Sequence, residues 1–171
     1  MEVLFVGYYE LGKIKVNMKF KKMVNEEIDE AVKKITRIDF HPISDYKRLA
    51  PEEYKKYKPA GKADVYWLPP DSYEADIYLP PTIKKWENMY IFIHEIGHAV
   101  NKHAGLSLDI DIRENEADMY AMRRMEQWLS KVEKEGDKNE IKKIIAIVKM
   151  RIKDRISYKN SRLSSKDDHF F

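Results

Sequence analysis

The stretch from residue 91 to residue 100 constrains this chain most, because two histidines and a glutamate interrupt an otherwise uncharged helical segment. Apolar and small residues surround His94, Glu95 and His98, so this helix is expected to be largely buried. Buried polar side chains are costly unless they have hydrogen-bond or ionic partners. Two core histidines that are satisfied by hydrogen bonds alone are therefore a weaker interpretation than a shared functional site.

The spacing of the two histidines favours metal binding. His94 and His98 are four residues apart, so they lie on one helix face, one turn apart, and their imidazoles can converge on one ion. Glu95 follows the first histidine, where it could contact a water molecule rather than the ion. This is the H-E-x-x-H arrangement of zinc peptidases. The chain contains no cysteine, so histidine and carboxylate side chains alone would hold the metal.

A catalytic zinc site needs a third protein ligand and an open position. The metzincin pattern would place glycine at 101 and histidine at 104, where this sequence has Asn101 and Ala104. His103 lies about 140° around a continuing helix from His98 and is expected to point elsewhere. The remaining source is a carboxylate from the following helix.

Residues 113–118 can supply that carboxylate. Glu114 and Asp118 share a helix face, so Glu114 could bind the ion while Asp118 accepts the N–H of a ligand histidine. Glu116 lies about 200° from Glu114 and would serve only in a different helix register. Glu114 could instead form a capping box with Asp111. We prefer Glu114 as the ligand and keep Glu116 as the alternative.

The two segments, residues 94–98 and 114–118, resemble the gluzincin branch of the zincin metallopeptidases. The E-x-x-A-D form of the second segment resembles the membrane-protease-like and ImmA/IrrE-like gluzincins. The small size resembles the minimal, single-domain gluzincins of archaea. The resemblance covers about residues 62–130, and the sixteen-residue step from His98 to Glu114 is short for the family.

The resemblance implies a zincin-like domain with one zinc ion per chain. By this resemblance the zinc ligands are His94, His98 and Glu114. It also implies that Glu95 is the general base and that Asp118 supports a ligand histidine. It also implies that a strand over residues 76–79 is the edge strand that borders the cleft. An extended peptide could add to such an edge by main-chain hydrogen bonds.

Periodicity along the chain predicts one α+β domain over residues 1–158, with strands mostly first and helices last. The predicted strands, in a mixed or antiparallel sheet, cover residues 3–9, 13–20, 38–41, 64–68 and 76–79. The predicted helices are one from about Asn25, an active-site helix over 83–104, a glutamate helix over about 111–134 and an amphipathic helix after 137. Residues 42–61 have no assignment beyond one helical turn after Pro51, and residues 159–171 are expected to form a polar tail.

Composition and charge bear on partners and location. The net charge of +3 is too small to indicate a nucleic-acid partner. Residues 142–166 hold nine lysines and arginines against Asp154, which leaves nucleic-acid binding open, although a solvated helix face is the preferred interpretation. We expect a cytoplasmic protein without a membrane partner, since no apolar run approaches 18 residues and no secretory leader is evident. Abundant lysine, glutamate and isoleucine with a single glutamine favours a thermophilic source.

The expected function is zinc-dependent hydrolysis of a peptide or protein, by an endopeptidase rather than an exopeptidase. Glu95 would take a proton from water and deliver it to the leaving amine. No side chain matches a family motif for the oxyanion donor; the available residues are Tyr66, Tyr120, Tyr158, His41, His103 and His169. The alternative is a latent or regulatory zinc-binding protein with little general proteolytic activity, whose C-terminal residues 169–171 could occupy the cleft.

Overall fold

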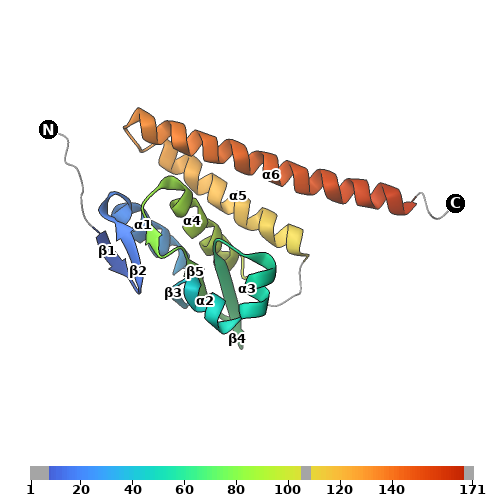
Figure 1. Ribbon diagram of the computed structural model, residues 1–171, viewed down its shortest axis with the longest axis horizontal. Helices are drawn as coiled ribbons and strands as arrows, with labels where there is room; N and C mark the ends of the chain where they lie inside the picture. The colour runs from blue at the N-terminus through green and yellow to red at the C-terminus, as the bar shows by residue number, and fades with distance from the viewer. Residues whose placement is uncertain (1–7, 105–108, 168–171) are drawn as a thin grey trace.

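The computed structural model describes residues 8–104 and 109–167 and confirms the predicted α+β class (Figure 1). In the first of its two small sheets, β1 (Tyr8–Leu11) pairs antiparallel with β2 (Ile14–Asn17), and β2 pairs parallel with β6 (Thr82–Ile83). The predicted strand over 13–20 ends early, because the Asn17 side chain accepts the N–H of Lys19 and begins a 3-10 turn.

That turn, η1 (Met18–Phe20), leads directly into α1 (Lys21–Ala31), so the first helix begins four residues before Asn25. Asn25 is therefore inside the helix rather than at its start. Val32 follows the last turn and is half exposed. The alternating pattern thus predicted a strand correctly at its start and misjudged where the helix takes over.

The second sheet lies under the candidate site. Its middle strand is β5 (Ser72–Leu79), which pairs parallel with β3 (Arg37–Pro42) and antiparallel with β4 (Lys62–Leu68). The prediction that residues 76–79 form an edge strand is therefore wrong. The edge strand beside the helix that carries His94 is β4, because β5 is paired on both sides, with β3 and with β4.

The segment without a sequence assignment forms two short helices. These are α2 (Ile43–Leu49) and α3 (Pro51–Tyr57), with Pro51 at the first helical position, where its missing N–H costs nothing. Tyr46 is buried, whereas no residue of α3 is. The helical turn predicted after Pro51 is thus confirmed as α3, and the lack of a continuous apolar face explains why periodicity predicted no more of this pair.

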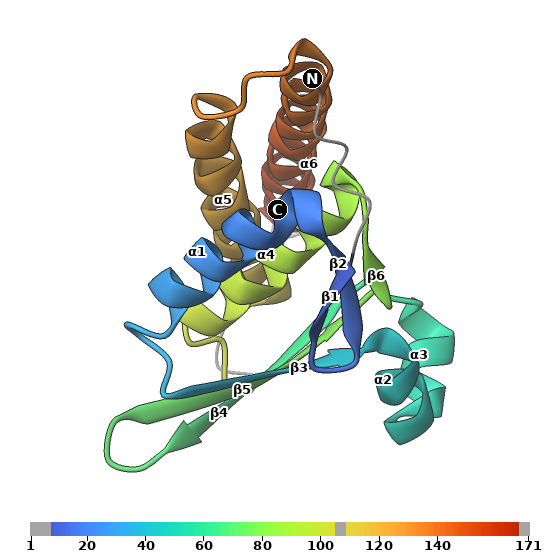
Figure 2. The same cartoon turned by 90° about the vertical axis from the view of Figure 1, so that its left-hand side faces the viewer.

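Three longer helices complete the fold: α4 (Trp86–Val100), α5 (Ile110–Leu129) and α6 (Glu135–Asp167). Figure 2 shows α4 between the β3–β5–β4 sheet and the α5–α6 pair. The predicted active-site helix is shorter at both ends, since residues 82–83 pair as β6 and the helix ends before Asn101. Residues 159–167, expected as a tail, continue α6, and residues 168–171 lie outside the described part.

The core surrounds α4, which explains the uncharged character of this helix. Its fully buried residues Phe92, Ile93 and Ile96 contact a continuous apolar cluster from the sheets, α1, α5 and α6. Glu27 of α1 is also fully buried, and Arg124 and Trp128 of α5 donate hydrogen bonds to its carboxylate. Over the described residues, no helix combines the length and the apolar character needed to cross a membrane.

Candidate metal centre

Helix α4 presents His94, Glu95 and His98 from the buried centre of the molecule. The histidines share one face, with ring centroids 4.9 Å apart. Gly97 faces α5, and a Cβ atom at this position would lie 3.0 Å from the carbonyl oxygen of Ala117. The missing side chain therefore lets α4 and α5 approach closely enough for α5 to reach the histidines.

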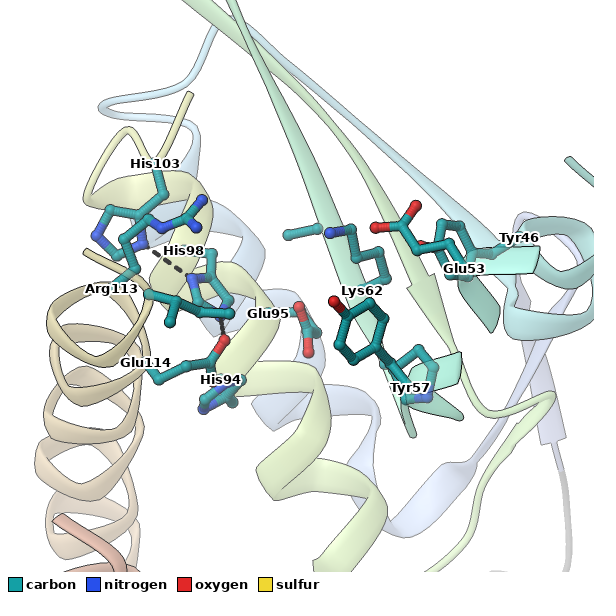
Figure 3. Close-up of a pocket in the computed structure, with 14 residues that line it drawn as sticks. Tyr46, Glu53, Tyr57, Lys62, His94, Glu95, His98, His103, Arg113 and Glu114 are labelled. Atoms are coloured by element: carbon teal, nitrogen blue, oxygen red, sulfur yellow. Dashed lines mark hydrogen bonds and ion pairs between the residues drawn. The ribbon is translucent and has the colours of Figure 1, made fainter. Parts of the chain in front are cut away.

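The carboxylate of Glu114, in the second turn of α5, faces both histidines (Figure 3). Its Oε2 lies 3.1 Å from His94 Nε2, and its Oε1 lies 3.3 Å from His98 Nε2. One ligand atom from each of the three residues lies within 4.8 Å of the other two. Glu114 does not cap its helix: the N-cap is Asp109, whose side chain accepts the N–H of Asp111. The structure thus brings together the three predicted ligands.

Asp118, one turn further along α5, holds the other ring nitrogen of His94. Its fully buried carboxylate lies 2.8 Å from His94 Nδ1 and accepts the hydroxyl hydrogen of Tyr90. Arg151 of α6 donates to both oxygens at 3.1 and 2.7 Å, and Arg155 donates at 2.6 Å. Burial raises the pKa of Asp118, but these hydrogen bonds outweigh it and hold the pKa well below its usual range.

His103 contacts the other ring nitrogen of His98, although the sequence predicted that it would point elsewhere. Its Nδ1 lies 2.8 Å from His98 Nδ1, and its Nε2 lies 3.1 Å from the Glu116 carboxylate. The helical angle does not apply, because α4 ends at Val100 and the positive φ of 58° at Lys102 turns the chain back. Glu116 therefore contacts His103 rather than the candidate ligands.

These contacts indicate which ring nitrogen of each candidate histidine carries the proton. Asp118 accepts from Nδ1–H of His94, and His103, which donates its own Nε2–H to a carboxylate, accepts from Nδ1–H of His98. In the neutral rings both Nε2 atoms are then acceptors, and both face the carboxylate of Glu114. Three acceptors that converge without a donor are an arrangement that a cation between them would satisfy.

Without a metal ion, one proton serves as that cation. Burial disfavours the charged form of His94, but hydrogen bonds to Asp118 and Glu114 outweigh burial and raise its pKa to about 10. Burial lowers the pKa of His98, and the charge of His94 adds to this effect. In the absence of a metal ion the proton therefore lies on His94, between its Nε2 and the Glu114 carboxylate. A bound metal ion would replace this proton.

Glu95 lies beside the three candidate ligands but does not join them. It is 6% exposed, and over residues 8–104 and 109–167 no hydrogen bond or ion pair engages its carboxylate. Burial raises its pKa to about 7. Gly61 faces it closely, since a Cβ atom at that position would lie 3.0 Å from Glu95 Oε1. A small residue at position 61 therefore leaves room for this carboxylate.

The site opens into a cleft with two cavities, of about 460 and 190 Å³. Both are lined by His94, Glu95, Glu114 and Gly61, so the four residues stand at the boundary between them. Gly61 and the first two residues of β4, Lys62 and Ala63, form part of the larger cavity's wall. Because β4 is an edge strand, it takes the place in the cleft that the sequence had assigned to residues 76–79.

The opposite wall of the larger cavity comes from residues that the sequence did not single out. Figure 3 shows Glu53, Tyr57 and Lys62 across the cleft from the histidines. Arg113 lies on the other side, beside His98 and His103. Glu53 and Tyr57 belong to α3, whose lack of apolar periodicity gave no signal. Of the residues considered for the oxyanion, only His103 lines either cavity within the described residues, and His169 lies outside the described part.

His41, another of those candidates, lies away from the cleft on β3, where its Nε2 is 2.9 Å from the Asp76 carboxylate. The sequence-based expectation of an oxyanion donor thus stays without a named residue. Comparisons with known proteins add no assignment: no protein-family model matches the chain, and no curated protein or solved structure gives a significant match.

Proposed function

We propose that the chain is a zinc-dependent metallopeptidase with one zinc ion held by His94, His98 and Glu114. The proposal rests chiefly on the three acceptors that converge while both Nδ1–H groups point outward. Two imidazoles and one carboxylate are a common ligand set of catalytic zinc, with a fourth position left open. Bound zinc would supply a Lewis acid that polarises a carbonyl and lowers the pKa of a coordinated water molecule.

Glu95 is the general base in this proposal. It is adjacent to a ligand, opens on both cavities and has no hydrogen-bond partner among the described residues, so its carboxylate is available to a water molecule. It would accept a proton as water attacks the scissile carbonyl and return that proton to the leaving amine. A purely structural zinc site would not need such a carboxylate.

The edge of β4 is our candidate for binding the peptide main chain. Its first residues line the larger cavity, and edge strands present free N–H and C=O groups to an extended segment. The edge is open only in part, because Val65 makes an isolated parallel bridge with Ala104. A substrate would therefore pair with β4 on the Lys62 side of Val65.

The basic character of α6 supports nucleic-acid binding less than the sequence alone did. Arg151 and Arg155 are used internally, on Asp118, and the Lys149 ammonium lies 3.9 Å from the Glu126 carboxylate of α5. We therefore keep nucleic-acid binding as a secondary proposal. DNA affinity that falls steeply with added salt would support it, and absent binding would exclude it.

The decisive test compares wild type with Glu95→Gln, both loaded with zinc, on a mixture of quenched fluorescent peptides. Glu95→Gln should keep about one zinc per chain and lose hydrolysis by at least 100-fold, since general-base catalysis contributes about 10²–10⁴-fold. The matched control is Glu87→Gln, an exposed glutamate near the start of the same helix, which should keep both. Full activity in Glu95→Gln would contradict the mechanism.

A further inference from the structure

The smaller cavity differs in charge from the rest of the cleft. Its wall on the α6 side consists of Arg151 and Arg155, and Tyr90 of α4 lies next to them. The same cavity is lined by His94, Glu95 and Glu114, so the two arginines share it with the candidate reacting centre. In the mechanism proposed above, neither arginine contacts the substrate.

Asp118 engages only part of the hydrogen-bonding capacity of the two guanidinium groups. Arg151 donates from Nε and Nη2, to Asp118 and to the Tyr90 hydroxyl oxygen. Arg155 donates from Nη1, to Asp118 and to Asn115. Within the described residues, no hydrogen bond involves Arg151 Nη1 or Arg155 Nε and Nη2. A guanidinium group carries five N–H donors, so several remain for a ligand.

The charges on this wall do not balance. Asp118 is the one carboxylate that pairs with the two guanidinium groups in the described part of the chain, and its side chain is fully buried behind them. The Arg151 and Arg155 side chains are 42% and 20% exposed, so their positive charge reaches the cavity. Glu95 and Glu114, which line the same cavity, would be compensated by the divalent ion of the proposed function. One positive charge therefore remains in excess next to the cavity.

We propose that Arg151 and Arg155 form a subsite for a carboxylate of the peptide substrate. The inference rests on the proposed function and adds a substrate class to it: peptides that carry a carboxylate close to the cleaved bond on the α6 side. Planar guanidinium groups bind carboxylates through paired, charge-assisted hydrogen bonds. The carboxylate can be the chain terminus or an acidic side chain, and the cavity volume of about 190 Å³ limits the size of the residue that carries it.

The test measures binding of matched peptides to zinc-loaded Glu95→Gln protein, which cannot turn them over. Three peptides are compared. The first has a free C-terminal carboxylate, the second is the same peptide with a C-terminal amide, and the third is the amidated peptide with one glutamine replaced by glutamate. A carboxylate should tighten binding about 10-fold over the neutral amide, as expected for charge-assisted hydrogen bonds. Preference for the free acid identifies the chain terminus as the source, and preference for glutamate identifies a side chain.

Variants of α6 test the assignment to the two arginines. Arg155→Gln in the same background should reduce the preference to less than about 3-fold, whereas Arg155→Lys, which keeps the charge, should retain part of it. Lys153→Gln is the matched control, because Lys153 is an exposed residue of the same helix and lines neither cavity. Arg155 is chosen over Arg151 because it makes fewer hydrogen bonds to Asp118.

Zinc content and melting temperature are measured on each sample. Zinc-loaded protein that binds the three peptides equally would overturn the subsite and leave the proposed function standing. A preference that survives Arg155→Gln in folded, zinc-loaded protein would also overturn the assignment. Protein that holds no zinc after reconstitution would instead overturn the proposed function, so the two failures are distinguishable.

Discussion

The two candidate histidine ligands are held by different means. His94 contacts the fully buried carboxylate of Asp118, which is itself fixed by Tyr90 and by two arginines from α6. His98 contacts another imidazole, that of His103, whose far nitrogen meets a glutamate at the surface. The support of His94 is thus an ionic network in the core. The support of His98 is a chain of hydrogen bonds from His98 through His103 to Glu116 at the surface, which we call the relay.

The difference places two candidate ligands of unlike charge preference in one site. A buried carboxylate on Nδ1 favours positive charge on His94, whereas the neutral His103 ring gives no such charge to His98. The Asp118 network also ties α4, α5 and α6 together, while the relay ties α4 only to the start of α5. We therefore expect the two supports to contribute unequally to zinc affinity and to stability.

The largest effect is expected from Asp118→Asn. It removes the charge that Arg151 and Arg155 neutralise, and breaking a buried ion pair costs about 3–5 kcal/mol in the free energy of unfolding. Zinc affinity should fall about 100-fold, the upper end for partners of a ligand histidine. Competition with a chelator and chemical unfolding measure the two quantities. The control Glu126→Gln, exposed on the same helix, should change neither, and an equal response of the two variants would contradict the ranking.

A smaller effect is expected from His103→Phe. Phenylalanine fills the space but offers no acceptor to Nδ1–H of His98, which frees that ring to reorient. Zinc affinity should fall about 10-fold. Stability of the metal-free protein should change by less than in Asp118→Asn, because no buried charge loses its partner. A loss of affinity as large as that of Asp118→Asn would remove the proposed inequality of the supports.

Glu116→Gln should have a smaller effect still. The amide oxygen of glutamine can accept the Nε2–H of His103. His103 Nδ1 therefore still accepts the Nδ1–H of His98. The Glu116 side chain is 40% exposed, and we expect zinc affinity to change by no more than about 3-fold. A loss near 100-fold in the same chelator competition would instead favour Glu116 as a direct ligand.

The finest comparison is the protonation of the two rings in the chelator-treated protein. The pKa of His94 is raised to about 10, so the stability that its proton provides is complete below about 6.5 and is lost as pH rises toward 10. The pKa of His98 is lowered, so its protonation destabilises the fold as pH falls through 6.5. The melting temperature should therefore decline both as pH rises from about 6.5 toward 10 and as pH falls below about 6.5. NMR of the imidazole nitrogens should report His94 charged and His98 neutral at pH 8. Two neutral rings at pH 8 would contradict the expected difference.

Local periodicity was enough to predict the triad. His94 and His98, like Glu114 and Asp118, are four residues apart, and that spacing places each pair on one helix face whatever the tertiary context. The packing of α4 on α5 then needed only a short connection. The α+β class could be predicted from the same kind of pattern.

The features that the sequence did not predict depend on contacts distant along the chain or on a local break. His103 was missed because the helix ends before it, which a helical wheel cannot represent. Arg151 reaches Asp118 across 33 positions, and only the packing of α6 on α5 decides which of many basic residues turns inward. The edge strand was misassigned because the resemblance to gluzincins supplied residues 76–79, whereas the pairing order of strands in a sheet is a tertiary property.

Zinc per chain, measured by elemental analysis, tests the central claim most directly when wild type is compared with Glu114→Ala and Glu116→Ala. The two glutamates are two residues apart on one helix, but only Glu114 faces both histidines. We expect about one zinc ion in wild type and in Glu116→Ala, and a marked loss in Glu114→Ala. No zinc in wild type after reconstitution, or full zinc in Glu114→Ala, would contradict the assigned metal centre.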